Sequence, residues 1–208
     1  MPIPEDPTDL SLDPAPSNPI ELFRLWYALA QERLDRPNPS TMALATCDGE
    51  GHPSVRMVLL KEFGEAGVTF YTNYDSRKAK ELEATGRAAL LFHWDELGLQ
   101  VRIEGPIERT SAEVSDGYFA SRARESQAGA WASDQSEPCE HFSKLAIRYM
   151  QVLEQYEGRE IPRPPHWGGY RIALEQMEFW VSQEHRIHHR HLYSRDAQGD
   201  WRSHRLYP

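Results

Sequence analysis

Short apolar, β-branched runs separated by glycine turns fill the middle of the chain, and they restrict the possible folds more than any other feature. Such runs are typical of antiparallel strands joined by tight turns. The strands predicted here are residues 41–47, 54–61, 68–72, 87–94 and 99–108. Because they do not alternate regularly with helices, a doubly wound nucleotide-binding sheet is not predicted. The pattern favours a mainly β, α+β protein: a small barrel with helices around it.

The remaining sequence supplies those helices and three further strands. Asn18 is a suitable cap and Pro19 a suitable first residue for a helix that ends at Pro37 and Pro39. Further helices are predicted from near Ser76, from near Ser111 and over residues 140–156, and further strands over 170–181, 189–195 and 201–206. The pair Gly105-Pro106 inside a predicted strand suggests a bulge or an edge.

A chain of 208 residues is the usual size of one domain. Six of the 15 prolines fall in the acidic segment 1–19, which is poor in apolar residues. We therefore expect a flexible N-terminal arm over residues 1–17 and a single domain over residues 18–208.

Charge and cysteine content exclude several classes of function. With 23 Lys and Arg against 32 Asp and Glu, the net charge of −9 disfavours nucleic acid and anionic membrane as partners. The two cysteines, Cys47 and Cys139, form neither a disulfide framework nor a thiolate zinc site, and they suit a cytoplasmic location. No apolar run is long enough to span a membrane, and no secretory signal is recognisable. The dinucleotide, P-loop, HExxH and GxSxG motifs are absent.

The first group of basic residues surrounds a predicted helix start. Arg56 and Lys61 lie on one strand but point to opposite faces unless a bulge intervenes. Arg77 and Lys78 follow Ser76 in the first turn of a helix, where cations oppose the helix dipole unless an anion binds there. Either a phosphate site or two solvated surface charges would account for this pattern.

A second group of basic and hydroxyl side chains follows Tyr118. If residues 111–122 are helical, Tyr118 and Arg122 lie four residues apart on one face, with Ser126 close behind. An aromatic hydroxyl, a guanidinium and a serine would hold a phosphate well. A surface arginine packed on a tyrosine is the alternative.

Four histidines lie between residues 185 and 191, beside Trp180. No carboxylate or cysteine has metal-ligand spacing with them, so no metal is predicted. A histidine that positions a ligand or moves protons is favoured, although exposed strand histidines remain an alternative. Trp180 is the tryptophan best placed to lie beside a flat aromatic ligand.

An ordered set of motifs resembles the pyridoxamine 5′-phosphate oxidase family. The matching segments, which cover the chain from about residue 18 onward, are RMVLLK at 56–61, FYTN at 70–73, SRK at 76–78, QVR at 100–102, YFASR at 118–122, GAWAS at 129–133, QS at 135–136, PPHWGGY at 164–170, EFW at 178–180, RIH at 186–188 and RL at 205–206.

The resemblance implies an FMN-binding split β-barrel that forms a homodimer with the flavin at the subunit interface. It implies oxidation of pyridoxamine or pyridoxine 5′-phosphate to pyridoxal 5′-phosphate. Hydride passes from the substrate to flavin N5, and O2 reoxidises the flavin and yields H2O2. The protein then contributes placement and electrostatics.

Site residues follow from the same matches. The implied FMN contacts are Arg56, Met57, Val58, Leu59, Leu60, Lys61, Tyr71, Thr72, Arg77, Lys78, Gln100, Gln135, Ser136, Trp180 and Arg190. The implied contacts to the substrate phosphate are Lys61, Tyr118, Arg122 and Ser126. Arg186 and His188 match the catalytic pair, Arg186 for orientation and charge stabilisation and His188 for hydrogen bonding or proton handling.

The chain departs from the family pattern at several positions. His189 stands where the family has Asp, and Val181-Ser182-Gln183 replaces a glycine-rich stretch. Two alternatives therefore stay open: a related oxidase of the phenazine-pathway type, and a flavin- or pyridoxal-phosphate-binding protein with weak turnover. The four residues matched to the substrate phosphate favour a phosphorylated substrate.

Overall fold

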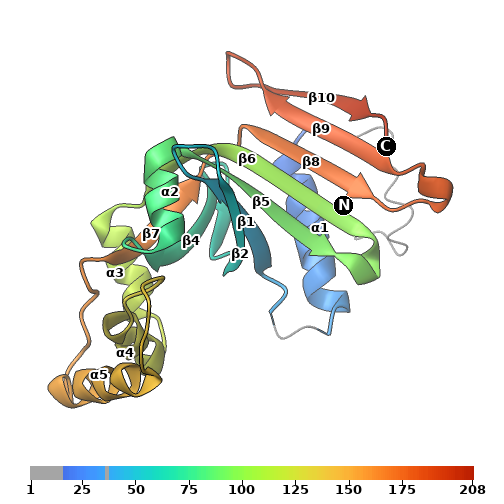
Figure 1. Cartoon of the computed structure of the whole chain (residues 1–208). Helices are drawn as coiled ribbons and strands as arrows, with labels where there is room; N and C mark the ends of the chain where they lie inside the picture. Colours follow the sequence, from blue (N-terminus) through green and yellow to red (C-terminus); the bar gives the residue numbers. More distant parts are fainter. Residues whose placement is uncertain (1–15, 36–37) are drawn as a thin grey trace.

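One strongly curled antiparallel sheet forms the body of the molecule (Figure 1). The computed structural model describes residues 16–35 and 38–208, and ten strands pair within that part of the chain. The sheet order is β10-β9-β8-β6-β5-β1-β2, and β7 joins β6 to β4, which in turn pairs with β3. The strands are β1 (Thr41–Cys47), β2 (Pro53–Leu59), β3 (Glu62–Gly64), β4 (Gly67–Asn73), β5 (Arg87–Trp94), β6 (Leu99–Arg109), β7 (Trp167–Ile172), β8 (Gln176–Val181), β9 (His189–Arg195) and β10 (Trp201–Leu206).

The helices lie around this sheet, so the expectation of a strand-rich barrel with outer helices is confirmed. They are α1 (Pro19–Arg33), α2 (Arg77–Thr85), α3 (Ala112–Ala120), α4 (Arg124–Ala132) and α5 (Phe142–Gln155), with 3₁₀ turns at Asp95–Leu97 and Glu184–Arg186. The three helices α3, α4 and α5 form a helical lobe at the opposite end of the molecule from β8–β10 (Figure 1). Among the described residues, no helix is both long and apolar enough to cross a bilayer.

Helix α1 begins as its capping residue predicts. The side chain of Asn18 accepts a hydrogen bond from the backbone N–H of Ile20 at 2.9 Å, and Pro19 occupies the first helical position. The helix ends at Arg33, earlier than expected; of the two prolines predicted to end it, Pro37 lies outside the described residues. The predicted arm, residues 1–17, also lies outside them except for its last two positions.

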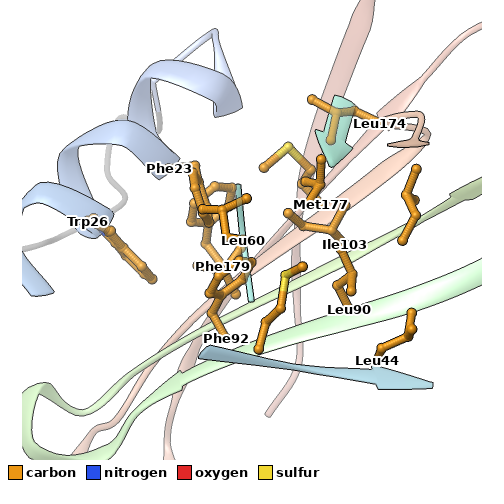
Figure 2. Close-up of a cluster of buried hydrophobic side chains, with 14 of the residues drawn as sticks. Phe23, Trp26, Leu44, Leu60, Leu90, Phe92, Ile103, Leu174, Met177 and Phe179 are labelled. Atoms are coloured by element: carbon orange, nitrogen blue, oxygen red, sulfur yellow. The ribbon is translucent and has the colours of Figure 1, made fainter. Parts of the chain in front are cut away.

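Helix α1 covers the concave face of the sheet and completes the main hydrophobic core (Figure 2). The ring of Phe23 meets Phe92 at 5.0 Å between centroids, and Trp26 meets Phe179 edge-on at 5.1 Å. All four side chains are fully buried. Aromatic pairs in this geometry add to the stabilisation from area burial, so α1 is held firmly on β5 and β8.

Strand β6 pairs with strands in both halves of the curled sheet. Its residues 99–104 pair with β8 and its residues 107–109 pair with β7, while β5 lies along its other side. Gly105 lies at the change of partner, where a Cβ atom would come within 1.9 Å of the carbonyl oxygen of Ala173. Of the two alternatives predicted for Gly105-Pro106, a bulge or an edge, the edge is therefore wrong: glycine is needed because two backbones approach closely in the middle of the sheet.

Two other boundaries differ from expectation. The predicted strand 170–181 is in fact two strands, β7 and β8, because the chain changes partner at residues 173–175 without a turn-forming residue to mark the break. The helix that begins after Ser111 ends at Ala120, so Arg122 lies beyond it and not on its face. Helix α4, which we did not predict, follows directly.

Candidate functional site

A cavity of about 510 Å³ lies between strands β2 and β4 and the helical lobe. It gathers many of the side chains that the sequence singled out. Its lining consists of Met57, Val58, Leu59, Lys61, Tyr71, Thr72, Lys78, Tyr118, Arg122, Ala123, Ser126, Gln135 and Trp167. We call these residues the cavity group. Both predicted phosphate clusters, one from the start of α2 and one from the end of α3, contribute to it.

Arg122 is the most unusual member of the cavity group. Its Cζ atom lies 4.6 Å from the centroid of the Trp167 ring and 5.6 Å from that of Phe119. Its Nη1 atom is shielded from solvent and has no hydrogen-bond partner in the described part of the chain. Burial lowers the pKa of Arg122 from its ordinary value, and no carboxylate among the described residues offsets that effect. A half-buried guanidinium with a shielded, unpartnered nitrogen and no counter-charge is costly unless an anion binds it.

The other substrate-phosphate candidates surround the same space. Lys61 follows the end of β2, and its Nζ atom lies 5.7 Å from the ring centroid of Tyr118. Ser126 and Ala123 place the first turn of α4 on the cavity, where free backbone N–H groups favour an anion. The structure therefore brings Lys61, Tyr118, Arg122 and Ser126 together, as predicted.

Stacked aromatic rings form one wall of the cavity. Tyr71 on β4 stacks on Tyr118 at 3.9 Å and on Trp167 at 5.4 Å between centroids. The hydroxyl of Tyr71 is buried without a partner among the described residues. Burial, reinforced by the nearby charge of Glu62, raises the pKa of Tyr71 to about 12, so the hydroxyl keeps its proton and is available as a donor.

Lys78 in the first turn of α2 holds a second polar corner of the cavity. Its Nζ atom donates to the side-chain oxygens of Gln135 at 2.8 Å and Thr72 at 3.2 Å. Burial, together with the positive charge of Arg56, lowers the pKa of Lys78 to about 8. Lys78, Thr72 and Gln135 thus lie together, as the resemblance implies.

Arg56 and Arg77 do not line this cavity, although both were predicted to contact the cofactor. Each donates to the buried carboxylate of Glu81, Arg77 Nε at 2.7 Å and Arg56 Nη2 at 3.2 Å. Burial alone would raise the pKa of Glu81, but the hydrogen bonds from Ser54, Thr46 and the two arginines lower it to about 2. Sequence reasoning missed Glu81, although its position four residues after Arg77 on a helix was a usable signal.

Two more predicted contacts also lie away from the cavity. Leu60 belongs to the main hydrophobic core. Ser136, with a φ of 78°, lines a separate hollow of about 450 Å³ beside α5.

The remaining predicted residues form a strand group on β6, β8, β9, the 3₁₀ turn that precedes β9 and the link between the two: Gln100, Trp180, Arg186, His188 and Arg190. Gln100 pairs with Trp180, which pairs with Arg190 on the next strand. The rings of His188 and Trp180 lie 4.5 Å apart, and His188 Nδ1 accepts the backbone N–H of Gln183 at 3.1 Å. In the neutral ring the proton then lies on Nε2, which is free to donate.

Backbone strain marks the turn that carries Arg186. His185 has a φ of 56° and Arg186 a φ of 63°, two consecutive non-glycine residues in the left-handed region. Each such residue costs on the order of 1 kcal/mol, and strain of this kind clusters at functional sites.

A buried carboxylate fixes Arg190 in the strand group. Glu178 accepts both Nε (2.8 Å) and an Nη nitrogen (3.1 Å) of Arg190, and it also accepts from Arg102 at 2.7 Å. This ion pair raises the pKa of Arg190. Glu178 was matched as part of a motif but was not assigned a role.

The two groups do not meet within one protomer. Strands β2 and β8 are four positions apart in the sheet, or about 19 Å along it at the usual strand spacing. No member of the strand group lines the cavity. Within residues 16–35 and 38–208, no three His, Cys, Asp or Glu side chains gather to form a metal site.

Comparison with known proteins identifies the family. The family model described as pyridoxamine 5′-phosphate oxidase matches residues 30–156, and the pyridoxine 5′-phosphate oxidase C-terminal dimerisation region matches residues 167–208. The pyridoxine/pyridoxamine 5′-phosphate oxidase of Rubrobacter xylanophilus is 51% identical over 96% of this chain and 91% of its own length. Its namesake from Paraburkholderia phytofirmans is 50% identical over 92% of this chain and 89% of its own.

Among solved structures, PhzG from Burkholderia lata 383 in complex with tetrahydrophenazine-1-carboxylic acid is similar, with a TM-score of 0.89 and 34% identity over 96% of each chain. The two family models together span most of the chain. They and the relatives near 50% identity all indicate the same family. The chain belongs to the pyridoxamine 5′-phosphate oxidase family.

Proposed function

We propose that the protein oxidises pyridoxamine 5′-phosphate or pyridoxine 5′-phosphate to pyridoxal 5′-phosphate with FMN as cofactor, and that O2 is reduced to H2O2. Curated relatives that are half identical over almost the whole chain carry that activity in their names. The observation in the structure that supports it best is the half-buried guanidinium of Arg122, whose Nη1 atom is shielded from solvent and has no partner among the described residues, in a cavity that also holds Lys61, Tyr118 and Ser126.

These four side chains suit the phosphate of the substrate. A guanidinium binds phosphate oxygens through two parallel hydrogen bonds, and an ammonium adds a second charge. The hydroxyls of Tyr118 and Ser126 and the first turn of α4 supply further donors. One side of the Arg122 guanidinium is already shielded from water in the folded protein. A phosphate bound there supplies the hydrogen bonds that this side lacks, and binding does not have to dehydrate that side again.

The cavity also fits a flat cofactor with its own phosphate. Tyr71 presents an unpartnered buried hydroxyl, and Lys78, Thr72 and Gln135 form a polar corner beside it. We propose that Lys78 binds the FMN phosphate and that strand β2, through residues 57–59, borders the ring. When bound, FMN supplies the hydride acceptor that this set of side chains lacks.

We propose that the strand group of a second copy completes each site. The family's dimerisation region, residues 167–208, contains four of its five members. The outer strand β2, which borders the cavity, exposes Val55 and Met57 at 69% and 62% of their surfaces, and an apolar edge of this kind needs a cover. In this arrangement Arg186 orients the substrate and stabilises charge, and the Nε2–H of His188 donates a hydrogen bond.

The direct test is turnover by purified protein loaded with FMN. We expect pyridoxamine 5′-phosphate in air to yield pyridoxal 5′-phosphate and H2O2 in equal amounts, each followed by absorbance. Pyridoxamine without the phosphate serves as the control and should react far more slowly. If the phosphorylated compounds are not oxidised while tetrahydrophenazine-1-carboxylic acid is, the protein is instead an oxidase of the phenazine-pathway type.

The pKa of Lys78 predicts how cofactor binding depends on pH. With a pKa of about 8, Lys78 is mostly protonated at pH 7 and mostly neutral at pH 9. Because a phosphate binds the protonated form, FMN affinity should fall as the pH rises through 8, by about tenfold for a lost charge-assisted hydrogen bond. Quenching of FMN fluorescence measures the affinity.

The matched control for this pH effect is Lys80, two residues further along α2, which pairs with Glu137 outside the cavity. Lys78→Met should weaken FMN binding at pH 7 and flatten the pH dependence, whereas Lys80→Met should preserve both. An equally steep pH dependence in Lys78→Met would show that another group titrates.

A further inference from the structure

Trp167, the first residue of β7, shapes the surroundings of Arg122. Its ring is 6% exposed and lines the cavity. The guanidinium of Arg122 lies 4.6 Å from this ring and 5.6 Å from Phe119, and the two rings meet edge-on at 5.1 Å. Arg122 is therefore held in an aromatic corner.

The ring of Trp167 is itself fixed from several directions. The backbone carbonyl of Trp167 accepts a hydrogen bond from Nη1 of Arg163 at 2.6 Å. Arg163 Nε in turn donates to the carboxylate of Asp116, also at 2.6 Å. The backbone N–H of Trp167 donates to the carbonyl oxygen of Pro164 at 3.1 Å. Tyr71 stacks on the ring with only 11° between the planes. A ring held in this way offers Arg122 one defined surface.

The glycines that follow Trp167 make this packing possible. A Cβ atom on Gly169 would lie 2.9 Å from Cε1 of Tyr71 and 2.5 Å from the hydroxyl of Thr110, and one on Gly168 would lie 2.0 Å from the hydroxyl of Tyr74. Side chains at either position would push the tyrosines out of place. The Trp-Gly-Gly sequence thus acts as a unit that seats Tyr71 and Trp167 against each other.

We propose that Trp167 is a positioning residue. It fixes which edge of the Arg122 guanidinium faces the cavity, and it leaves the positive charge of Arg122 without a counter-charge. This inference rests on the proposed function. A carboxylate would orient an arginine equally well but would neutralise it, as Glu178 does to Arg190. An aromatic face orients the guanidinium plane and attracts the cation while leaving the N–H groups free. The site thereby selects an anionic group, and Trp167 contributes to that selection without touching the phosphate.

The test compares Trp167→Leu with Trp167→Phe in FMN-loaded protein. We expect Trp167→Leu to raise the KM for pyridoxamine 5′-phosphate about tenfold, since a desolvated cation–π contact is lost, with a much smaller change in kcat. The dissociation constant of inorganic phosphate, measured by calorimetry, should rise in parallel. Trp167→Phe keeps an aromatic face and should recover most of both.

Trp131 provides the matched control. It lies on α4 in the same lobe, donates from Nε1 to the carbonyl of Pro162 and does not line the cavity. Trp131→Leu should leave the KM and phosphate binding as in the parent protein. Unchanged KM and phosphate binding in Trp167→Leu would overturn the proposal, as would equal losses in Trp131→Leu.

A second variant covers the case in which Trp167→Leu fails to fold. Arg122→Lys keeps the charge but loses the planar group that Trp167 orients, so it should weaken phosphate binding nearly as much as Arg122→Ala. Parental phosphate binding by Arg122→Lys would refute the role of the ring. If the parent protein binds inorganic phosphate but does not oxidise pyridoxamine 5′-phosphate, the proposed function fails. These binding comparisons still decide the role of Trp167 in that case.

Discussion

Replacing Arg122 with alanine is expected to raise the KM for pyridoxamine 5′-phosphate by about two orders of magnitude. The substitution removes a half-buried guanidinium that has no carboxylate partner among the described residues, and truncating the partner of a bound phosphate costs about 3 kcal/mol. Steady-state kinetics with the phosphorylated substrate measures the effect. FMN affinity should stay close to the parental value, because Lys78 and Gln135 hold the other polar corner.

Arg124 is the matched control for Arg122. Two residues away, its guanidinium donates to the backbone carbonyls of Tyr156 and Arg159, and it does not line the cavity. Arg124→Ala should therefore leave the KM unchanged, although it removes the same charge. A parental KM in Arg122→Ala, or a similar increase in Arg124→Ala, would remove the proposed phosphate site.

Mixing two impaired variants is expected to restore activity, measured at substrate concentrations below the parental KM, if each site is shared between two protomers. Arg122→Ala damages the cavity group, and Arg186→Ala, which should retain FMN but lose most of its turnover, damages the strand group. When equal amounts exchange subunits, half of the dimers are mixed, and one of the two sites in each mixed dimer is intact. Activity should return to about a quarter of the parental value.

The control for this mixing experiment pairs two variants of the same group. Arg122→Ala mixed with Lys61→Ala should gain nothing, because every site then contains a damaged cavity group. If the mixture of Arg122→Ala and Arg186→Ala also shows only the sum of its components after verified subunit exchange, the two groups do not combine across subunits.

Strands bounded by clear turn residues could be predicted to the residue. The predicted ranges 41–47, 87–94, 189–195 and 201–206 coincide with β1, β5, β9 and β10. Each of these strands has glycine or polar turn residues next to at least one of its ends. These are local signals, and the paired strands that they define are adjacent in the chain.

Boundaries set by distant contacts could not be predicted in this way. Nothing in residues 170–181 marks the break between β7 and β8, because the break follows from where β6 changes partners. The end of α3 before Arg122 and the start of α4 after it likewise depend on how the lobe packs.

The residues of the candidate site could likewise be predicted only in part. The resemblance identified most of the cavity group, and the structure brings those residues together. It did not show that Arg56 and Arg77 turn toward Glu81. The helical spacing of Arg77 and Glu81 could have indicated their pair, but nothing in the sequence indicates that Arg56 shares the same carboxylate. Nor could it anticipate that Gln100, Trp180 and Arg190 lie on another part of the sheet. One chain contains both groups, but the strands that lie between β2 and β8 in the sheet keep them apart.

The continuous sheet has a consequence for how the two sites of the proposed dimer communicate. Each protomer contributes its cavity group to one site and its strand group to the other. The hydrogen-bonded ladder β2-β1-β5-β6-β8 connects these contributions inside a single protomer. We therefore expect any coupling between the two sites of the proposed dimer to pass through this ladder.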